Sequence, residues 1–231
     1  MKRFIVLLTV LCLMLAGCSE PKTEATTAAA TEATTAATEA ATAATEKVEE
    51  GKKIAPLADS TMENLDDAIL AVSLEEGGAY VDDDGRMQMD VKIYSYDKYD
   101  MVDVAELKVG DVLVRNDGEV EITSIEKKDD GTLLVNGGLE KGGFDLGTDD
   151  CGIFFEIGYN DAKSWYEVGE ATIRVSEDFE FVDNMNQDEE IVAYPGDFLN
   201  GAVTDYYFIP DNTTVRVEEG QIVEMNRVYI P

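Results

Sequence analysis

The sequence predicts an all-β fold, a mostly antiparallel sandwich or barrel-like domain with one or two short helices. Three observations indicate this fold class. Short runs such as residues 87–94 alternate apolar and polar side chains, which is typical of half-buried strands. Asp and Gly turn signals separate these runs at regular spacing. Helical patterns do not alternate with the runs, which argues against βα units. By its length, the segment 54–231 forms a single domain.

The first element of this domain can be interpreted in two ways. Residues 60–63 fit a capping box, and Leu65, Ile69 and Val72 continue at helical spacing, which favours a helix. Residues 68–74 fit a buried strand equally well. We predict one helical turn followed by a strand, because the chain after this point is β in character.

The middle of the chain is predicted from alternation and turn chemistry. Residues 82–85 form an acidic turn that leads into a strand at 87–94, and residues 100–107 form a short helix. The turn at 116–118 ends in Asp-Gly, which supplies the positive φ that a tight hairpin needs. Further strands are expected at 112–114, 120–125 and 132–135, all joined by short acidic turns.

The last third continues the β pattern after a glycine-rich passage. We predict no strand within this passage, residues 137–152, and interpret its pairs Gly137-Gly138 and Gly142-Gly143 as flexible loop positions. Residues 196–202 form a helical turn, and a hairpin with its turn at Glu219-Gly220 closes the chain. The strands predicted here are 153–157, 171–175, 179–182, 191–194, 213–217 and 222–230.

A short motif precedes the strand at 112–114. Leu107, Gly110 and Asp111 resemble the Leu-x-x-Gly-Asp segment that enters a strand in many small barrels, including Hint-like and SH3-like ones. Hint-type autoprocessing uses a cysteine or serine nucleophile with histidine, and this sequence contains no histidine. The resemblance therefore implies barrel-like geometry and no activity.

The N-terminus has the features of an export signal. Lys2 and Arg3 precede an apolar stretch at 4–15, which is shorter than the roughly twenty residues that cross a bilayer. The segment Leu15-Ala16-Gly17-Cys18 resembles the lipobox of bacterial lipoproteins. That resemblance implies a signal peptide at 1–17, a diacylglyceryl thioether on Cys18 and an extracytoplasmic protein anchored to the cell membrane. The alternative is an ordinary secretory signal that carries a cysteine.

The segment that follows Cys18 is predicted to be a disordered tether over residues 18–53. Residues 23–46 contain only Ala, Thr and Glu, without the apolar side chains that a coiled coil needs. A flexible chain of this length has a reach of roughly 30 Å. The tether would therefore hold the folded domain away from the membrane.

Composition excludes several function classes. The chain has 49 acidic and 18 basic residues, so no basic surface is available to bind nucleic acid. The absence of histidine removes Ser-His-Asp triads and histidine-ligated zinc. Cys151 is the one thiol left to the mature domain, and we expect a buried small hydrophobic side chain there. We predict no catalytic residue, no cofactor and no metal ligand.

Three candidate chemistries remain open. A pair of carboxylates could support an envelope hydrolase, because a glycosidase needs only two acids across a cleft. Asp82-Asp83-Asp84-Gly85 resembles the start of a calcium loop, although Arg86 and Ile93 stand where further ligands are needed, and an acidic turn explains it better. Tyr94 and Tyr96 share one face of their strand and are candidates for contact with a glycan or protein.

Taken together, these features predict a membrane-anchored extracytoplasmic lipoprotein. Its membrane contact runs through the lipid at Cys18, and its domain acts as a surface binding or structural module. The expected partner is a cell-envelope protein or glycan. The layout resembles that of surface lipoproteins of Gram-positive bacteria. A carboxylate-dependent envelope hydrolase and a calcium-binding surface module are the alternatives.

Overall fold

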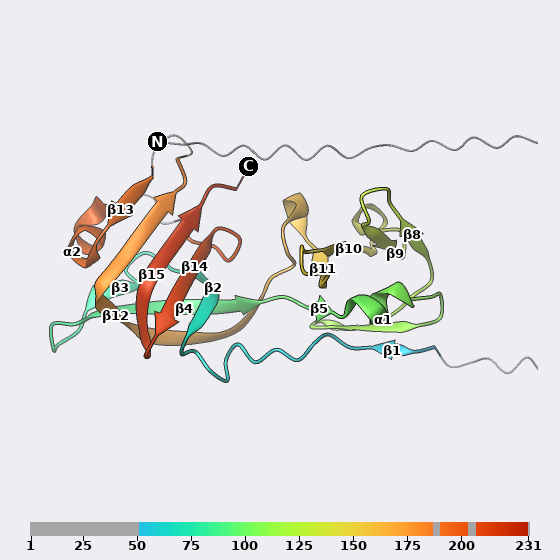
Figure 1. Ribbon diagram of the computed structural model, residues 1–231, viewed down its shortest axis with the longest axis horizontal. Helices are drawn as coiled ribbons and strands as arrows, with labels where there is room; N and C mark the ends of the chain where they lie inside the picture. Colours follow the sequence, from blue (N-terminus) through green and yellow to red (C-terminus); the bar gives the residue numbers. More distant parts are fainter. Residues whose placement is uncertain (1–50, 187–189, 203–206, 231) are drawn as a thin grey trace, which may run out of the picture. The chain divides into compact units, whose positions relative to one another are not determined.

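The computed structural model describes residues 51–186, 190–202 and 207–230 (Figure 1). The predicted signal peptide, the lipid attachment at Cys18 and almost all of the predicted tether lie outside these residues. The described residues belong to one compact unit. They hold two clusters of buried hydrophobic side chains. Strands make up 49% of the structure against 10% helix, which confirms the all-β prediction.

The larger sheet surrounds the first core. In pairing order its strands are β13 (Ile191–Ala193), β12 (Tyr166–Asn184), β15 (Gln221–Val228), β14 (Thr213–Glu218), β2 (Ala68–Ser73), β4 (Met87–Ser95) and β3 (Ala79–Val81). The first part of β12 pairs with β4, and from Arg174 onward β12 pairs with β15. The sheet therefore closes on itself through β12 (Figure 1).

Five strands form this closed ring, in the order β2, β4, β12, β15, β14 and back to β2. All neighbours are antiparallel except β12 and β15, which are parallel. Numbered along the chain, the ring runs 1-2-3-5-4-1. This is the connectivity of the OB-fold, a five-stranded Greek-key barrel.

Alternate side chains of the ring fill the barrel, as strand periodicity requires. Met89, Val91 and Ile93 of β4 are buried, whereas Asp90 and Lys92 point outward. A helical segment between the third and fourth ring strands, α2 (Pro195–Asp197) with η3 (Phe198–Ala202), adds to the core. Its Phe198 is fully buried and packs edge-on against Phe179 and Phe181.

The second core lies in the chain between β4 and β12, together with the first strand. One sheet contains β5 (Lys98–Tyr99), β11 (Phe154–Ile157), β10 (Phe144–Thr148), β9 (Leu133–Val135) and β8 (Ile125–Lys127). A second contains β1 (Lys53–Ile54), β6 (Val112–Arg115) and β7 (Gly118–Glu121). The helical elements are α1 (Met101–Ala105), η1 (Leu139–Lys141) and η2 (Tyr159–Asp161). We call this part the inserted unit, because it interrupts the barrel between its second and third strands.

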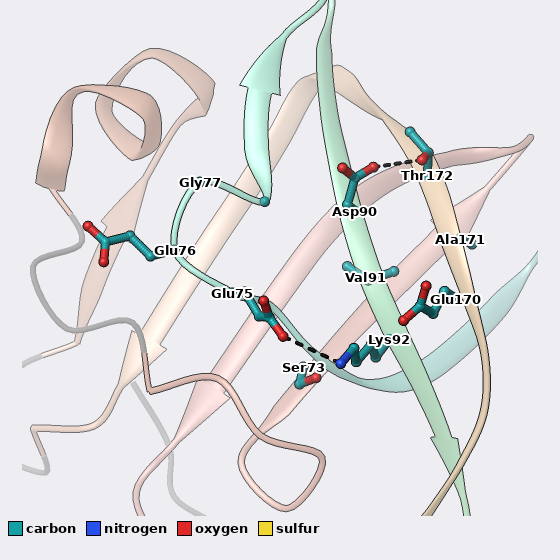
Figure 2. Close-up of a pocket in the computed structure, with 11 residues that line it drawn as sticks. Ser73, Glu75, Glu76, Gly77, Asp90, Val91, Lys92, Glu170, Ala171 and Thr172 are labelled. Atoms are coloured by element: carbon teal, nitrogen blue, oxygen red, sulfur yellow. Dashed lines mark hydrogen bonds and ion pairs between the residues drawn. The ribbon is translucent and has the colours of Figure 1, made fainter.

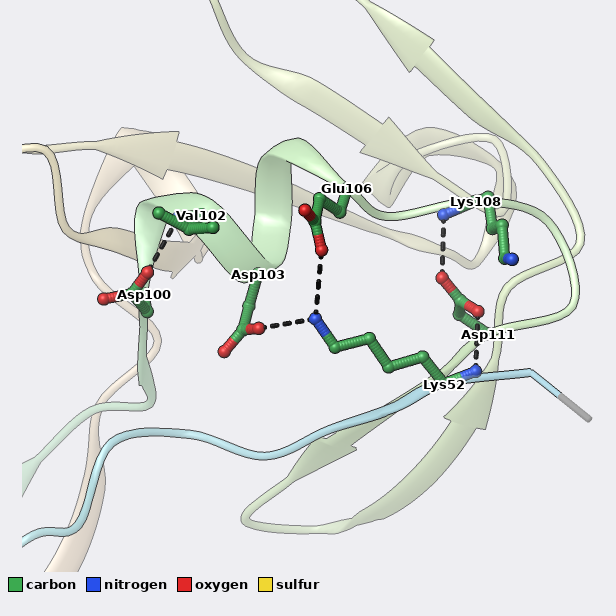
Figure 3. Close-up of polar contacts among 7 residues, drawn as sticks. All are labelled: Lys52, Asp100, Val102, Asp103, Glu106, Lys108 and Asp111. Carbon is green, nitrogen blue, oxygen red and sulfur yellow. Dashed lines mark hydrogen bonds and ion pairs between the residues drawn. The ribbon is translucent and has the colours of Figure 1, made fainter.

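Asp111 of the Leu-x-x-Gly-Asp segment has a structural role in the inserted unit (Figure 3). Its fully buried carboxylate accepts hydrogen bonds from the backbone N–H of Lys52 at 2.8 Å and of Lys108 at 3.0 Å. Nearby, the ammonium of Lys52 contacts Asp103 at 2.7 Å and Glu106 at 3.4 Å. Asp111 thus joins β1 to the turn that precedes β6.

Of the predicted helical turn at 60–63 and the strand after it, the strand is confirmed as β2, and the turn is a single hydrogen-bonded turn without the predicted capping box. Residues 61–63 form a hydrogen-bonded turn, and the strand β2 begins at Ala68. The reason is that Asp59, not Ser60, supplies the side-chain acceptor. Its Oδ1 accepts from the N–H of Thr61 at 2.9 Å and from the Thr61 hydroxyl at 2.6 Å. This local Asx turn satisfies the backbone without starting a helix.

The single strand predicted at 120–125 is wrong, because the chain leaves one sheet and enters another there. β7 ends at Glu121 and β8 begins at Ile125. Between them, the Asn136 side chain accepts from the N–H of Thr123 at 2.7 Å and donates to the carbonyl of Glu121 at 2.8 Å. Asn136 therefore replaces the strand neighbour that these residues lack.

Two further predictions need correction. The glycine-rich passage 137–152 contains the strand β10, whose Gly147 lies against Ile157 with no room for a side chain. The strands predicted at 171–175 and 179–182 are both parts of β12, which has an irregularity between Val175 and Glu180.

Cys151 is exposed, contrary to the prediction that it is buried. The turn at its position explains the difference. Asp149 accepts hydrogen bonds from the N–H groups of Cys151 and Ile153, both at 2.9 Å, which places the cysteine at the tip of the β10–β11 hairpin.

The other predicted elements are confirmed within the described residues. The strand at 87–94 is β4, the short helix at 100–107 contains α1, and the helical turn at 196–202 overlaps α2 and η3. The terminal hairpin is β14 and β15, joined by Glu219 and Gly220 at φ values of 51° and 72°. Two positive φ values in succession suit the right-handed twist of a hairpin.

Candidate functional site

A pocket of about 680 Å³ lies on the outer face of the barrel (Figure 2). Three segments form it: Asp90–Lys92 of β4, Glu170–Thr172 of β12, and the chain from Ser73 to Gly78 that leaves β2. These are the second and third ring strands and the connection between the first and second. We call this pocket the groove.

The register of β4 and β12 determines which side chains meet in the groove. Thr172 lies opposite Asp90, and Glu170 lies opposite Lys92. All four point outward because the residues between them alternate into the barrel. The Thr172 hydroxyl donates to Asp90 Oδ1 at 2.6 Å. Figure 2 shows these four side chains on the same outer face of the two strands.

Lys92 is the cation among the residues that line the groove. Its Nζ lies 3.4 Å from Oε1 of Glu75, on the connection after β2. The hydrogen bond with Glu75 and the charges of Glu75 and Glu167 raise the pKa of Lys92. The ammonium is therefore held in its charged form across the neutral pH range.

A glycine holds the connection against the strands. The carbonyl of Gly78 accepts from the N–H of Asp90 at 2.8 Å. A Cβ at Gly78 would lie 2.7 Å from Cδ1 of Leu74 and 3.2 Å from the carbonyl oxygen of Asp90. A larger residue at this position would have to displace Leu74 or the connection itself, so glycine favours the close packing that shapes the groove.

The groove is chemically suited to neutral or cationic polar ligands. The carboxylates of Glu75, Asp90 and Glu170 accept hydrogen bonds, and the ammonium of Lys92 and the hydroxyl of Thr172 donate them. Acids outnumber the single Lys, so a phosphate-rich ligand would meet net repulsion. The three carboxylates are exposed, which leaves them without the burial that enzymes use to tune a general acid.

Besides Asp111, two other buried carboxylates of the inserted unit are committed to structure. Burial raises the pKa of Glu156, although the charge and hydrogen bond of Arg115 oppose this shift. Glu156 receives a hydrogen bond from Arg115 at 2.9 Å, and Asp97 accepts from the N–H of Asn116 at 2.7 Å. Neither residue lines the groove.

The acidic turn at residues 82–85 uses its first carboxylate internally. Asp82 accepts from the N–H groups of Asp84 at 3.0 Å and Arg86 at 2.8 Å, and from the Gln88 side chain at 2.8 Å. Across the part of the chain that the structure describes, no group of three or more acidic or cysteine side chains could hold a metal ion.

The two tyrosines singled out from the sequence lie in different surroundings, and both are half-buried. The Tyr94 hydroxyl lies 3.2 Å from that of Ser73, at the edge of the groove. Tyr96 packs edge-on against Phe155 and Trp165, away from the groove residues.

Comparison with known protein families, curated proteins and solved structures finds no match to this chain. Within the described ranges, no helix has the length and apolar character needed to span a membrane.

Sequence reasoning missed Asp90, Lys92, Glu170 and Thr172 as candidate site residues. The alternation in β4 does indicate that Asp90 and Lys92 face outward. Their partners on β12 are about eighty positions further along the chain, and no local pattern reveals that pairing.

Proposed function

We propose that this protein is a lipid-anchored extracytoplasmic lipoprotein whose barrel binds a cell-envelope ligand in the groove. The observation that carries the binding half is the position of the groove. It lies on the second and third strands of an OB-type ring and on the connection between the first and second strands. Barrels of this connectivity bind oligonucleotides and oligosaccharides on that face. This relation is an analogy of fold, so the ligand must be inferred from the side chains of the groove.

The groove chemistry selects the ligand class. Oligonucleotides are disfavoured because the chain carries a net charge of −31 and the groove is lined by Glu75, Asp90 and Glu170. A glycan brings many hydroxyl groups, which carboxylates accept and Lys92 and Thr172 complement. We therefore favour an uncharged or amino-bearing envelope glycan. A basic segment of an envelope protein is the second ligand class.

The anchoring half depends on the N-terminal residues. The lipobox-like segment ending at Cys18 supports acylation of that cysteine. Stable attachment requires more than one acyl chain, which a diacylglyceryl group supplies. Replacement Cys18→Ala should release the full-length protein from the membrane fraction or leave its signal uncleaved. A mature protein that stays membrane-bound without this thiol would contradict the anchor.

The groove is tested by sedimentation of the full-length protein with isolated, protein-depleted cell-wall glycan. We expect the double variant Asp90→Ala, Glu170→Ala to lose at least about tenfold in affinity, since each lost hydrogen bond to a charged group costs on the order of 1.5 kcal/mol. The matched control is Asp178→Ala, Glu180→Ala, which removes the same charge from exposed positions of β12 outside the groove.

The two double variants together decide between specific binding and general charge. Equal affinity of the two double variants for the glycan would contradict binding in the groove. The loss of affinity would then follow the net charge of the protein and not the position of the carboxylates. The same experiment with calcium added and then chelated tests the calcium-binding alternative. Release of reducing sugar during the incubation would instead support the hydrolase alternative.

A further inference from the structure

The inserted unit contains an aromatic cage around a lysine. The ammonium of Lys163 lies 4.3 Å from the ring centre of Tyr96, 5.5 Å from that of Trp165 and 5.7 Å from that of Phe155. All three distances fall within the roughly 6 Å over which a ring face attracts a cation. Tyr96 packs edge-on against each of the other two rings, which fixes them around the ammonium. We call Tyr96, Phe155 and Trp165 the cage.

The backbone that carries Lys163 is shaped to present it. Asn160 and Asp161 both adopt positive φ, at 55° and 60°, which non-glycine residues rarely do. The turn is closed by the N–H of Gly158 donating to the carbonyl of Ala162 at 2.6 Å, and Lys163 then bridges to Ile157. This turn, together with the bridge to Ile157, fixes the backbone from which the Lys163 side chain extends.

Lys163 occupies the cage although carboxylates are abundant. The chain has 49 acidic residues, yet no carboxylate of the described residues lies within ion-pair distance of Lys163. Other lysines, such as Lys52 and Lys92, do form ion pairs. The rings are therefore the interaction partner of this ammonium.

We propose that the cage is a binding site for a quaternary ammonium group, and that Lys163 fills it when no such ligand is present. A primary ammonium is strongly hydrated and gives up that hydration when it enters an aromatic site. A quaternary ammonium carries the same charge on methyl groups, and aromatic cages recognise it for this reason. The negative charge of the whole chain raises the local concentration of such cations.

The cage is open enough to exchange its occupant. Tyr96, Phe155, Lys163 and Trp165 are all half-buried, so none is sealed in the core. Lys163 and Trp165 also line a surface pocket of about 550 Å³ that contains the carboxylate of Asp211, which accepts a hydrogen bond from the Trp165 indole N–H. The pocket therefore opens onto the Trp165 side of the cage and onto Lys163. This site shares no residue with the groove, so it does not rest on the function proposed above.

Trp165 is the single tryptophan of the chain and reports directly on the cage. The test is a fluorescence titration of the full-length protein with choline chloride at constant ionic strength. We expect a saturable change. The neutral isostere 3,3-dimethyl-1-butanol, which has the shape of choline without its charge, should produce none. An equal response to both compounds would overturn the proposal.

Variants test whether Lys163 occupies the cage and whether the cage rings bind choline. A tethered competitor acts at a millimolar effective concentration, so Lys163→Ala should strengthen choline binding by about tenfold. Lys127→Ala is the matched control, because it removes one positive charge from an exposed side chain of β8 that contacts no cage ring. Tyr96→Leu and Phe155→Leu keep apolar bulk but remove the ring face, and each should abolish saturation. Circular dichroism confirms folding, and either variant suffices if the other unfolds.

Two results would refute the assignment. The first is a Lys163→Ala protein that binds choline no more tightly than the wild type. The second is a folded Phe155→Leu protein that binds as well as the wild type. Vesicles of phosphatidylcholine, compared with vesicles of phosphatidylglycerol, then distinguish a lipid headgroup from a free or polymer-borne choline. Binding to either choline source supports the cage.

Discussion

Replacement of Asp111 should destabilise the inserted unit more than its single side chain suggests. The buried carboxylate receives two backbone hydrogen bonds, from Lys52 at 2.8 Å and Lys108 at 3.0 Å (Figure 3). A hydrogen bond to a charged group contributes about 1.5 to 3 kcal/mol. Both hydrogen bonds are only partly buried, so water partly replaces the lost acceptor. The lower bound then applies to each bond, and Asp111→Ala should cost about 3 kcal/mol.

The assay is urea denaturation followed by circular dichroism, with the free energy of unfolding taken from the midpoint at an unchanged m value. Asp111→Asn should not restore stability, because one of its two side-chain positions becomes an NH₂ donor that faces a backbone donor. Lys52→Met is the control. It removes two ion pairs of a lysine side chain that is 44% exposed, and should cost less than about 1 kcal/mol. A loss below about 1 kcal/mol in Asp111→Ala, or wild-type stability in Asp111→Asn, would refute this account.

Three further outcomes are expected. Phe198→Ala should lower the free energy of unfolding by about 3 to 5 kcal/mol, because it opens a cavity in the barrel core, and urea denaturation measures it. The backbone N–H of Arg86 and the Gln88 side chain lower the pKa of Asp82 from its ordinary value of 3.8. The ionised Asp82 carboxylate therefore stabilises the fold at pH values above 3.8, and this stabilisation is lost as the pH falls through the lowered pKa. The decrease in melting temperature between pH 5 and pH 3 should therefore be smaller for Asp82→Asn than for the wild type. Exposed Cys151 should react with a thiol reagent in the native protein at the rate seen in urea, and strong protection would contradict its placement.

The fold class could be predicted from the sequence because its signals are local. The alternation in β4 and the Glu219-Gly220 turn are each contained in fewer than ten residues. The predictions failed locally where an Asp side chain made an Asx turn, as Asp59 and Asp149 do, and elsewhere the deciding contact was more distant. Thr123 breaks its strand because Asn136, thirteen positions away, takes its hydrogen bonds. Gly147 belongs to a strand because it pairs with Phe155 of β11, whereas sequence alone associates glycine with loops.

Less of the two candidate sites than of the fold could be predicted, because each site combines residues that are far apart in the sequence. Asp90 and Thr172 meet in the groove through the pairing of β4 with β12, which skips the whole inserted unit. Tyr96 was a candidate for exposed ligand contact, but two rings and Lys163 surround it. Its strand position indicated an outward side chain, and only the fold showed which residues lie against it.

The order of elements also relates the proposed anchor to the proposed binding face. The chain that leaves the predicted tether forms β1, which pairs in parallel with β6 of the inserted unit before the chain reaches the barrel. Ile54 is buried there, and Asp111 binds the adjacent backbone of Lys52. A pull transmitted from Cys18 would therefore reach β1 and its pairing with β6 before it reaches the barrel. The groove residues belong to β4 and β12, which are held inside the closed ring. On this reasoning, a protein under tension from its anchor loses the β1 contacts before the groove is disturbed.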